Sequence, residues 1–185
     1  MNWLIFTLIA YGTYVLQAGL APVWTLGTRT EPRLLLILLV YIAMQASPTT
    51  VAFAALVLGA LHDIRQTSVQ GLIGPWALGY LAAGYVLLQL RNLLFRDSVF
   101  TIAIMSLVAG VFAYLVSTAL YALRGVSFLL GQPVAEFSAA NAMFQGFFDL
   151  LYTAVIAMPV GYLLIKSHAA WSFQGANFHG VSRSR

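Results

Sequence analysis

Three ionisable side chains, His62, Asp63 and Arg65, stand close together in a chain of which only 8% is charged. A carboxylate beside an imidazole can tune it for proton transfer, so this group is the first place to look for catalysis. Adjacent residues of a helix, however, point about 100° apart and do not face each other. The sequence also has no Gly-x-Ser-x-Gly pattern, no His-Glu-x-x-His pattern and no cysteine. We therefore predict that the protein is not an enzyme, has no metal site and needs no cofactor.

Ionisable side chains at membrane depth are costly, and they usually face the interior of a helix bundle or a partner. We expect Asp63 at the C-terminal end of the third apolar segment, where the helix dipole disfavours a carboxylate. Arg65, Arg124 or a cation of a partner could offset that charge. Asp149 lies about two turns inside the last apolar segment and could pair with Arg124, bind a basic group of a partner or face a water-filled pocket. We interpret His62, Asp63, Arg65 and Asp149 as structural polar contacts or as contacts to a partner.

The elements that must position these side chains are membrane helices. The chain is 61% hydrophobic and has a mean hydropathy of +0.88, whereas soluble domains carry roughly 25% charged residues. The run over residues 34–40 is uniformly apolar, and a strand of a transmembrane barrel would alternate. We therefore predict an all-α integral membrane protein. We expect a lipid bilayer around it. Its basic residues are scattered and it has no phosphate-binding glycine motif, so we expect neither nucleic acid nor nucleotide as a partner.

Apolar segments predict a compact bundle of about six transmembrane helices. These segments are residues 4–21, 34–46, 51–61, 71–90, 98–122 and 141–165. The second and third are short for a full crossing and meet near Pro48, which disfavours a continuous helix. We favour two separate helices here, while one long helix kinked at Pro48 would leave five spans.

Basic residues at the ends of the segments predict the orientation. Arg91 and Arg96 flank the loop between the fourth and fifth segments, and Lys166 follows the sixth. Two spans separate these positions, so they lie on one side of the membrane, which the positive-inside rule makes cytoplasmic. We expect a single transmembrane domain over residues 1–166 and a mobile cytoplasmic tail over residues 167–185.

Small residues at a four-residue spacing predict where helices approach each other closely. Ala55, Gly59 and Asp63 share one face of the third segment, because residues four apart lie on the same side of a helix. The stretch over residues 59–72 is expected to be the polar bend that ends this segment, with Gly71 opening the next one. The positions predicted to pack helices together are Ala55, Gly59, Gly71, Gly79 and Ala83.

Three motifs together carry a family resemblance. They are Arg29-Thr-Glu-Pro-Arg33 before an apolar run, Gly59-x-x-x-Asp63 followed by Gly71, and Gly79-Tyr-Leu81 before Arg91-Asn-Leu-Leu-Phe-Arg96. With these motifs the chain resembles the bacterial rod-shape-determining MreD family over about residues 25–115. His62 and Arg65 stand where that family usually has apolar or small residues, so the resemblance supports a shared role for Asp63 and not for these two.

The resemblance implies a non-catalytic scaffold in the bacterial inner (cytoplasmic) membrane. Such a protein binds the bitopic protein MreC and helps to couple MreB filaments to RodA and its partner transpeptidase, the elongation-specific peptidoglycan synthases. An alternative is the substrate-binding membrane subunit of a vitamin uptake transporter, which is also a small six-helix protein. In that case His62, Asp63, Trp76 and Asp149 would line a ligand pocket.

Overall fold

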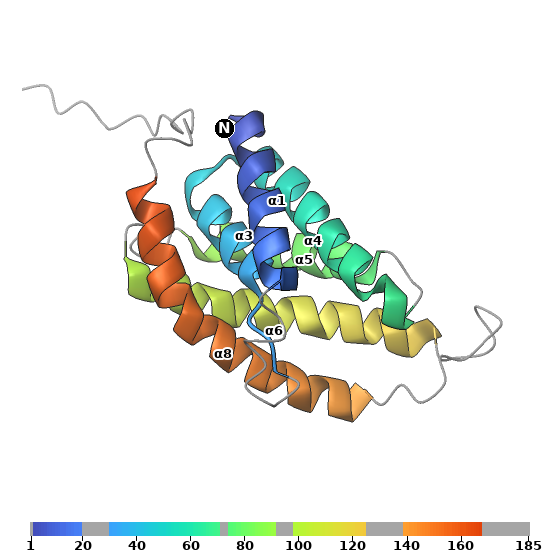
Figure 1. Cartoon of the computed structure of the whole chain (residues 1–185). Helices are drawn as coiled ribbons and strands as arrows, with labels where there is room; N and C mark the ends of the chain where they lie inside the picture. Colours follow the sequence, from blue (N-terminus) through green and yellow to red (C-terminus); the bar gives the residue numbers. More distant parts are fainter. Residues whose placement is uncertain (1, 20–29, 71–73, 92–97, 125–138, 168–185) are drawn as a thin grey trace, which may run out of the picture.

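The computed structural model describes residues 2–19, 30–70, 74–91, 98–124 and 139–167. All the secondary structure in these ranges is helical (Figure 1). The helices are α1 (Trp3–Gly19), α3 (Leu34–Gln45), α4 (Pro48–Gln70), α5 (Pro75–Leu90), α6 (Val99–Arg124) and α8 (Ala139–Lys166). The predicted all-α membrane class is confirmed, and the described ranges contain six helices.

The second and third apolar segments are separate helices, as favoured from the sequence. α3 ends at Gln45, Ala46 is extended, and α4 begins at Pro48. Proline is suited to the first turn of a helix because its missing N–H would have no partner there, and it disfavours helical backbone in the residue before it. The break between α3 and α4 is therefore a local consequence of Pro48.

The polar bend expected over residues 59–72 is wrong for its larger part. α4 does not end at Leu61 but continues as helix to Gln70. Two of the polar side chains that suggested the bend, His62 and Asp63, are buried inside the protein and find partners there. A helix does not need to end at its first polar residue when that residue is satisfied by neighbouring elements. Gly71 lies outside the described residues.

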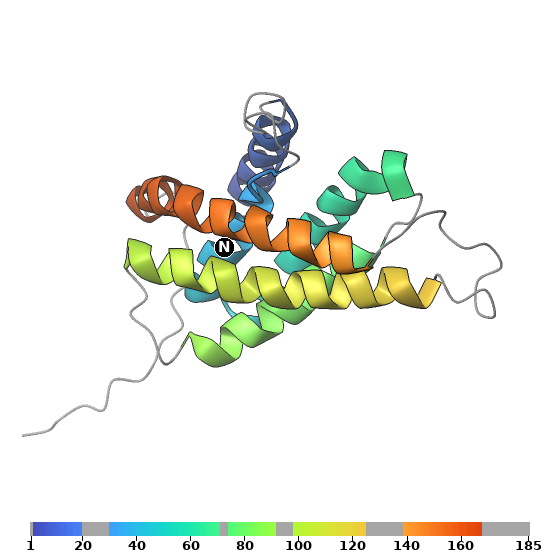
Figure 2. The ribbon, with the colours of Figure 1, turned by 90° about the horizontal axis from the view of Figure 1, so that it is seen from below.

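α3 is the central helix of the bundle. Every residue from Leu34 to Met44 is buried, and α3 contacts α1, α4, α5, α6 and α8 (Figures 1 and 2). A helix that is apolar on all sides is stable only inside the core. Its 12 residues span about 18 Å, and a hydrocarbon core is ~30 Å thick. At least one end of α3 therefore lies at membrane depth.

The longest helices form one wall around α3. α6 packs against both α5 and α8, and Figure 2 shows α6 and α8 running side by side. Residues Val99–Leu123 and Met143–Lys166, with mean hydropathies of 2.4 and 1.8, are long and apolar enough to cross a membrane. The remaining described helices are shorter or more polar, and they surround α3 on its other sides. The tail expected over residues 167–185 lies outside the described residues except for Ser167.

Two glycines set the distances between neighbouring helices. A Cβ added to Gly59 would lie 2.5 Å from the Cα of Ala77, so α4 and α5 are in backbone contact at this point. A Cβ added to Gly79 would lie 2.7 Å from the carbonyl oxygen of Ala113, so α5 meets α6 in the same way. In lipid, close packing of this kind replaces the hydrophobic drive that holds soluble helices together.

Candidate functional site

A buried arginine, Arg33, is the centre of the polar interior. Its Nη2 donates to the hydroxyl oxygen of Tyr114 at 2.5 Å and to Oδ2 of Asp149 at 3.1 Å. Its Nη1 is hydrogen-bonded to Nε2 of His62. The guanidinium carbon lies 4.9 Å from the ring centre of Trp76 and 5.2 Å from that of Tyr114. We call these five residues the Arg33 cluster.

The Arg33 cluster joins α4, α5, α6 and α8 to the start of α3. His62 comes from α4, Trp76 from α5, Tyr114 from α6 and Asp149 from α8, while Arg33 stands immediately before α3. The four helices that carry the other members pack against their neighbours through apolar side chains. Helix packing therefore places these residues, and the two terminal nitrogens of Arg33 then bond to His62, Tyr114 and Asp149. Within the described ranges, Nδ1 of His62 and Nε of Arg33 have no hydrogen-bond partner.

A short non-helical segment, residues 31–33, is attached to α8 by its backbone. The amide of Glu31 donates to Oδ1 of Asp149 at 3.0 Å, and the amide of Arg33 donates to Oγ1 of Thr153 at 2.9 Å. The hydroxyl of Thr153 in turn donates to the carbonyl oxygen of Asp149 at 2.6 Å. We call residues 31–33 the strap. Because these contacts use backbone amides, they hold the strap in place independently of the Arg33 side chain.

The charges in the Arg33 cluster cancel. The guanidinium of Arg33 is balanced by the carboxylate of Asp149, and both side chains are buried. A guanidinium can only donate hydrogen bonds, so Nε2 of His62 must accept, and the imidazole is neutral with its proton on Nδ1. His62 also packs against Trp76 and Tyr80, at ring-centre distances of 4.6 and 5.8 Å. These acids and bases are bonded to each other inside the bundle, an arrangement suited to holding helices together and not to turnover.

Asp63 has a different role from its neighbour His62. Its carboxylate accepts hydrogen bonds from the backbone amides of Gly74 at 2.9 Å, Trp76 at 3.1 Å and Ala77 at 3.0 Å. These amides form the N-terminus of α5, which starts at Pro75 and carries partial positive charge. Asp63 therefore caps α5 from α4. The expected position at a helix C-terminus is wrong, and the N-terminus of α5 offsets the charge that was expected to need a cation.

The face of α4 that carries Asp63 lies against α5. Gly59, one turn earlier, allows the backbone contact described above, and a Cβ on Gly84 of α5 would lie 3.5 Å from that of Ala55. Ala83 is also fully buried. The close approach at Gly59 brings the carboxylate of Asp63 within reach of the α5 amides.

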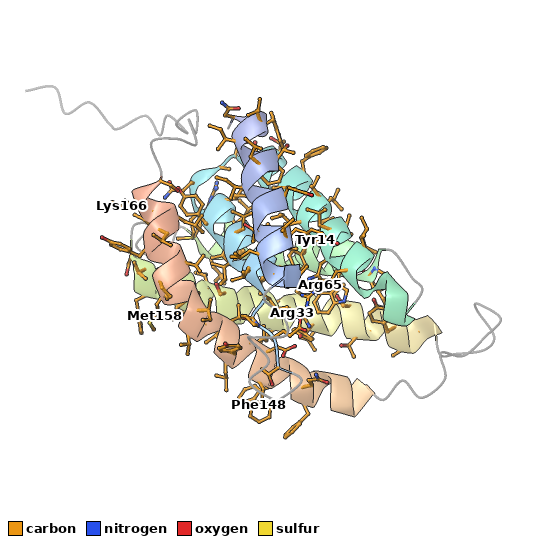
Figure 3. All side chains as sticks on the ribbon, in the orientation of Figure 1. Tyr14, Arg33, Arg65, Phe148, Met158 and Lys166 are labelled. Atoms are coloured by element: carbon orange, nitrogen blue, oxygen red, sulfur yellow. The ribbon has the colours of Figure 1, made fainter. Side chains whose placement is uncertain are left out.

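Arg65 pairs with Glu31, whose carboxylate accepts from its guanidinium. The side chains are 18% and 29% exposed, so this ion pair is the outer neighbour of the buried Arg33–Asp149 pair. Glu31 therefore connects α8, through its amide, to α4, through its carboxylate. Figure 3 shows the labelled Arg33 and Arg65 lying close together near the N-terminal end of α3.

Polar side chains also satisfy both ends of α3, and the sequence did not indicate them. Oε1 of Gln17 in α1 accepts from the amide of Leu35 at 3.2 Å. At the other end Nη1 of Arg91 donates to the carbonyl oxygen of Ala46 at 2.7 Å. Arg33 was missed as well, because it was assigned to a loop. The available signal was a basic residue directly before a helix that is apolar on every side.

An apolar groove of about 760 Å³ lies between α4 and α5. It is lined by Pro48, Thr49, Val51, Ala52, Leu78, Leu81, Ala82, Gly84, Tyr85 and Leu88, together with Val116 of α6. None of these residues belongs to the Arg33 cluster. The groove is therefore not suited to recognising a charged ligand. Within the described ranges no three or more His, Asp or Glu side chains come together to hold a metal ion.

Comparison with known protein families identifies a match. The model of the family described as rod shape-determining protein MreD matches residues 1–166, which include every helix described above. No match was found among curated proteins or among solved structures.

Proposed function

The chain belongs to the family of rod shape-determining protein MreD, and from this premise we propose that it is a scaffold subunit of the bacterial cell-elongation machinery. Members of this family are shape-determining membrane proteins and not enzymes. In the proposal, the chain binds a bitopic MreC-like protein and so links MreB filaments to the elongation-specific peptidoglycan synthases. It does so in the inner membrane, with its C-terminus in the cytoplasm.

The observation that carries the proposal is the state of the polar interior. Arg33, His62 and Asp149 are buried, and Arg33 is bonded to each of the other two. Asp63 is bonded to backbone amides at the start of α5. A bundle whose buried charges are paired inside it can present fixed outer surfaces to partners. It does not offer groups that could bind and release a substrate.

Vitamin uptake is less well supported by the same geometry. That function needs His62, Asp63, Trp76 and Asp149 to line a pocket. His62, Trp76 and Asp149 do converge, but the guanidinium of Arg33 lies between them. The groove between α4 and α5 has an almost wholly apolar lining, so it lacks the few placed polar groups that give a small-molecule site its specificity.

The outer faces of α1, α4–α5 and α8 are among the surfaces open to partners. Leu8 is 64% exposed, Tyr85 65% and Phe148 45%. Figure 3 shows Phe148, Met158 and Lys166 along the outer side of α8. Apart from Lys166 at the end of α8, the large side chains named on these faces are apolar, as expected of surfaces that meet lipid or another transmembrane helix.

Site-specific photo-crosslinking in cells tests the scaffold function. A photo-reactive amino acid is placed at Leu8, Tyr85 or Phe148, and at the fully buried Leu58 as a matched control. We expect at least one exposed position to yield an adduct with an MreC-like protein, and Leu58 to yield none. Adducts with paired ATPases and a membrane coupling subunit would contradict the scaffold function and support vitamin uptake instead. Adducts with neither class, in cells whose shape depends on the protein, would contradict both.

The orientation has its own test, because the chain contains no cysteine. Single cysteines at Ser98 and Ser167 are predicted to face the cytoplasm, and one at Thr30 the outside. A membrane-impermeant maleimide added to intact cells should therefore label only the Thr30 variant. Labelling of the Ser167 variant in intact cells would show that the orientation is the opposite of the one proposed.

A further inference from the structure

We propose that His62, Trp76, Tyr114 and Asp149 form a receptor for a guanidinium group, and that Arg33 is its occupant supplied by the chain itself. The receptor is a property of α4, α5, α6 and α8, whereas the occupant arrives on the strap. This inference concerns the interior of the bundle and does not depend on the proposed scaffold function.

The chemistry of the receptor is specific to a flat, delocalised cation. Asp149 and Tyr114 offer oxygen acceptors to one terminal nitrogen, and His62 offers a nitrogen acceptor to the other. The aromatic rings of Trp76 and Tyr114 both lie near the guanidinium carbon. A guanidinium is planar, weakly hydrated and able to stack on aromatic faces, whereas an ammonium is a compact, strongly hydrated point charge. These contacts match a guanidinium better than an ammonium.

The walls of the receptor have supports other than Arg33. The hydroxyl of Tyr114 donates to Asp149 at 2.6 Å, and the amide of Glu31 donates to the other oxygen of the same carboxylate. Trp76 is held at the start of α5 by Asp63 and makes an edge-to-face contact with Tyr114 at a ring-centre distance of 4.9 Å. We therefore expect Tyr114, Asp149 and Trp76 to stay in position when the Arg33 side chain is removed.

The occupant is recognised only at its end. Both terminal nitrogens of Arg33 are bonded, while its Nε has no hydrogen-bond partner within the part of the chain that the structure describes. The amide of Arg33 is separately bonded to Thr153. The aliphatic stem is thus a tether, and a free alkylguanidinium can present the same donors to the receptor once the tether is removed.

Chemical rescue of Arg33→Ala tests the receptor. The full chain is purified in a mild detergent and its thermal unfolding midpoint is measured. Because removal of one member of a buried ion pair is strongly destabilising, we expect the midpoint to fall by about 10 °C. Methylguanidinium chloride at roughly 10 mM, far below denaturing concentrations, should restore at least half of this loss. Methylammonium chloride and sodium chloride at the same concentration should not.

Two controls define the result. The double variant Arg33→Ala/Asp149→Asn lacks the receptor carboxylate and should show no recovery with methylguanidinium. The wild-type protein, whose receptor is filled, should not be stabilised either. Recovery in Arg33→Ala that the double variant also shows, or no specific recovery in Arg33→Ala, would overturn the proposal.

A second variant decides the matter if Arg33→Ala does not accumulate in membranes. Arg33→Lys keeps the charge and the ion pair with Asp149 but loses the flat fork. The proposal expects the Arg33→Lys protein to unfold several degrees below wild type. Trp76→Leu removes one aromatic side chain that contacts the guanidinium. In the Trp76→Leu background, the unfolding midpoints of the proteins with Arg33 and with Arg33→Lys should therefore lie closer together. An Arg33→Lys protein as stable as wild type would show that the site recognises only charge, and would overturn the proposal.

Discussion

The carboxylate of Asp63 in α4 accepts a hydrogen bond of 3.1 Å from the backbone amide of Trp76 in α5. The same carboxylate also accepts from the amides of Gly74 and Ala77. Asp63, a residue of α4, is therefore the N-terminal cap of α5. Trp76 is also a member of the Arg33 cluster, where its ring lies against the guanidinium of Arg33. The start of α5 is therefore fixed on one side by an acid of α4 and on the other by the polar interior of the bundle.

Removal of this cap should destabilise the protein. Asp63→Ala leaves three amides of α5 without their acceptor, so we expect a loss of about 2 kcal/mol in the free energy of unfolding. Asp63→Asn keeps one acceptor oxygen and should lose less of the free energy of unfolding. We also expect it to accumulate less in membranes and to associate more weakly with its partner. Unfolding in detergent measures the stability of both variants, and quantitative membrane blots measure their accumulation. Ile64→Ala, at a neighbouring position that is 54% exposed, is the matched control, and an equal loss there would contradict the capping role.

Gly59→Ala should separate α4 from α5. The added methyl group would meet backbone atoms of Trp76 and Ala77, which cannot turn aside as a flexible side chain can. We expect a loss of about 1–3 kcal/mol. Gly12→Ala in α1 is the control, because nothing lies within 4 Å of its added Cβ. It should be neutral or stabilising by roughly 0.5–1 kcal/mol, since alanine is the better helix former. If Gly59→Ala behaves like Gly12→Ala, the two helices are not in backbone contact.

The two ion pairs should differ strongly in their contribution to stability. Asp149→Asn leaves the buried guanidinium of Arg33 without its counter-charge and should cost about 3–5 kcal/mol. Glu31→Gln breaks the partly exposed pair with Arg65 and should cost about 0–1 kcal/mol. Thermal unfolding of both variants, with Arg65→Gln as a third, makes the comparison. Equal effects of Asp149→Asn and Glu31→Gln would mean that the Arg33–Asp149 pair is not shielded from solvent.

Truncation after residue 169 should leave insertion and cell shape intact. The family match ends at residue 166, and the residues beyond 169 are polar and contain glycine and serine, with no apolar run long enough to span a membrane. Membrane fractionation and microscopy of cells that carry the shortened chain test this. Loss of the protein from membranes would give the tail a role in insertion or stability.

Local features were readable from the sequence because they depend on neighbouring residues alone. Apolar runs predicted the helices, and Pro48 predicted the break between α3 and α4, since a proline restricts its own backbone and that of the residue before it. The short motifs around Gly59 and Asp63 predicted the family. The prediction of a bend after Leu61 was wrong because it took the first polar residues as the end of a helix, without knowing that the interior of the protein would satisfy them.

The partners of the polar residues were decided only by the tertiary structure. Arg33 and Asp149 are 116 positions apart in the chain, and their contact depends on how α3 and α8 are rotated and placed against each other. The sequence could not show that Asp63 meets the start of α5 and not a cation, because hydropathy says which residues avoid water but not which helix faces which. Burial of polar groups requires partners, and only the packed bundle determines which ones they are.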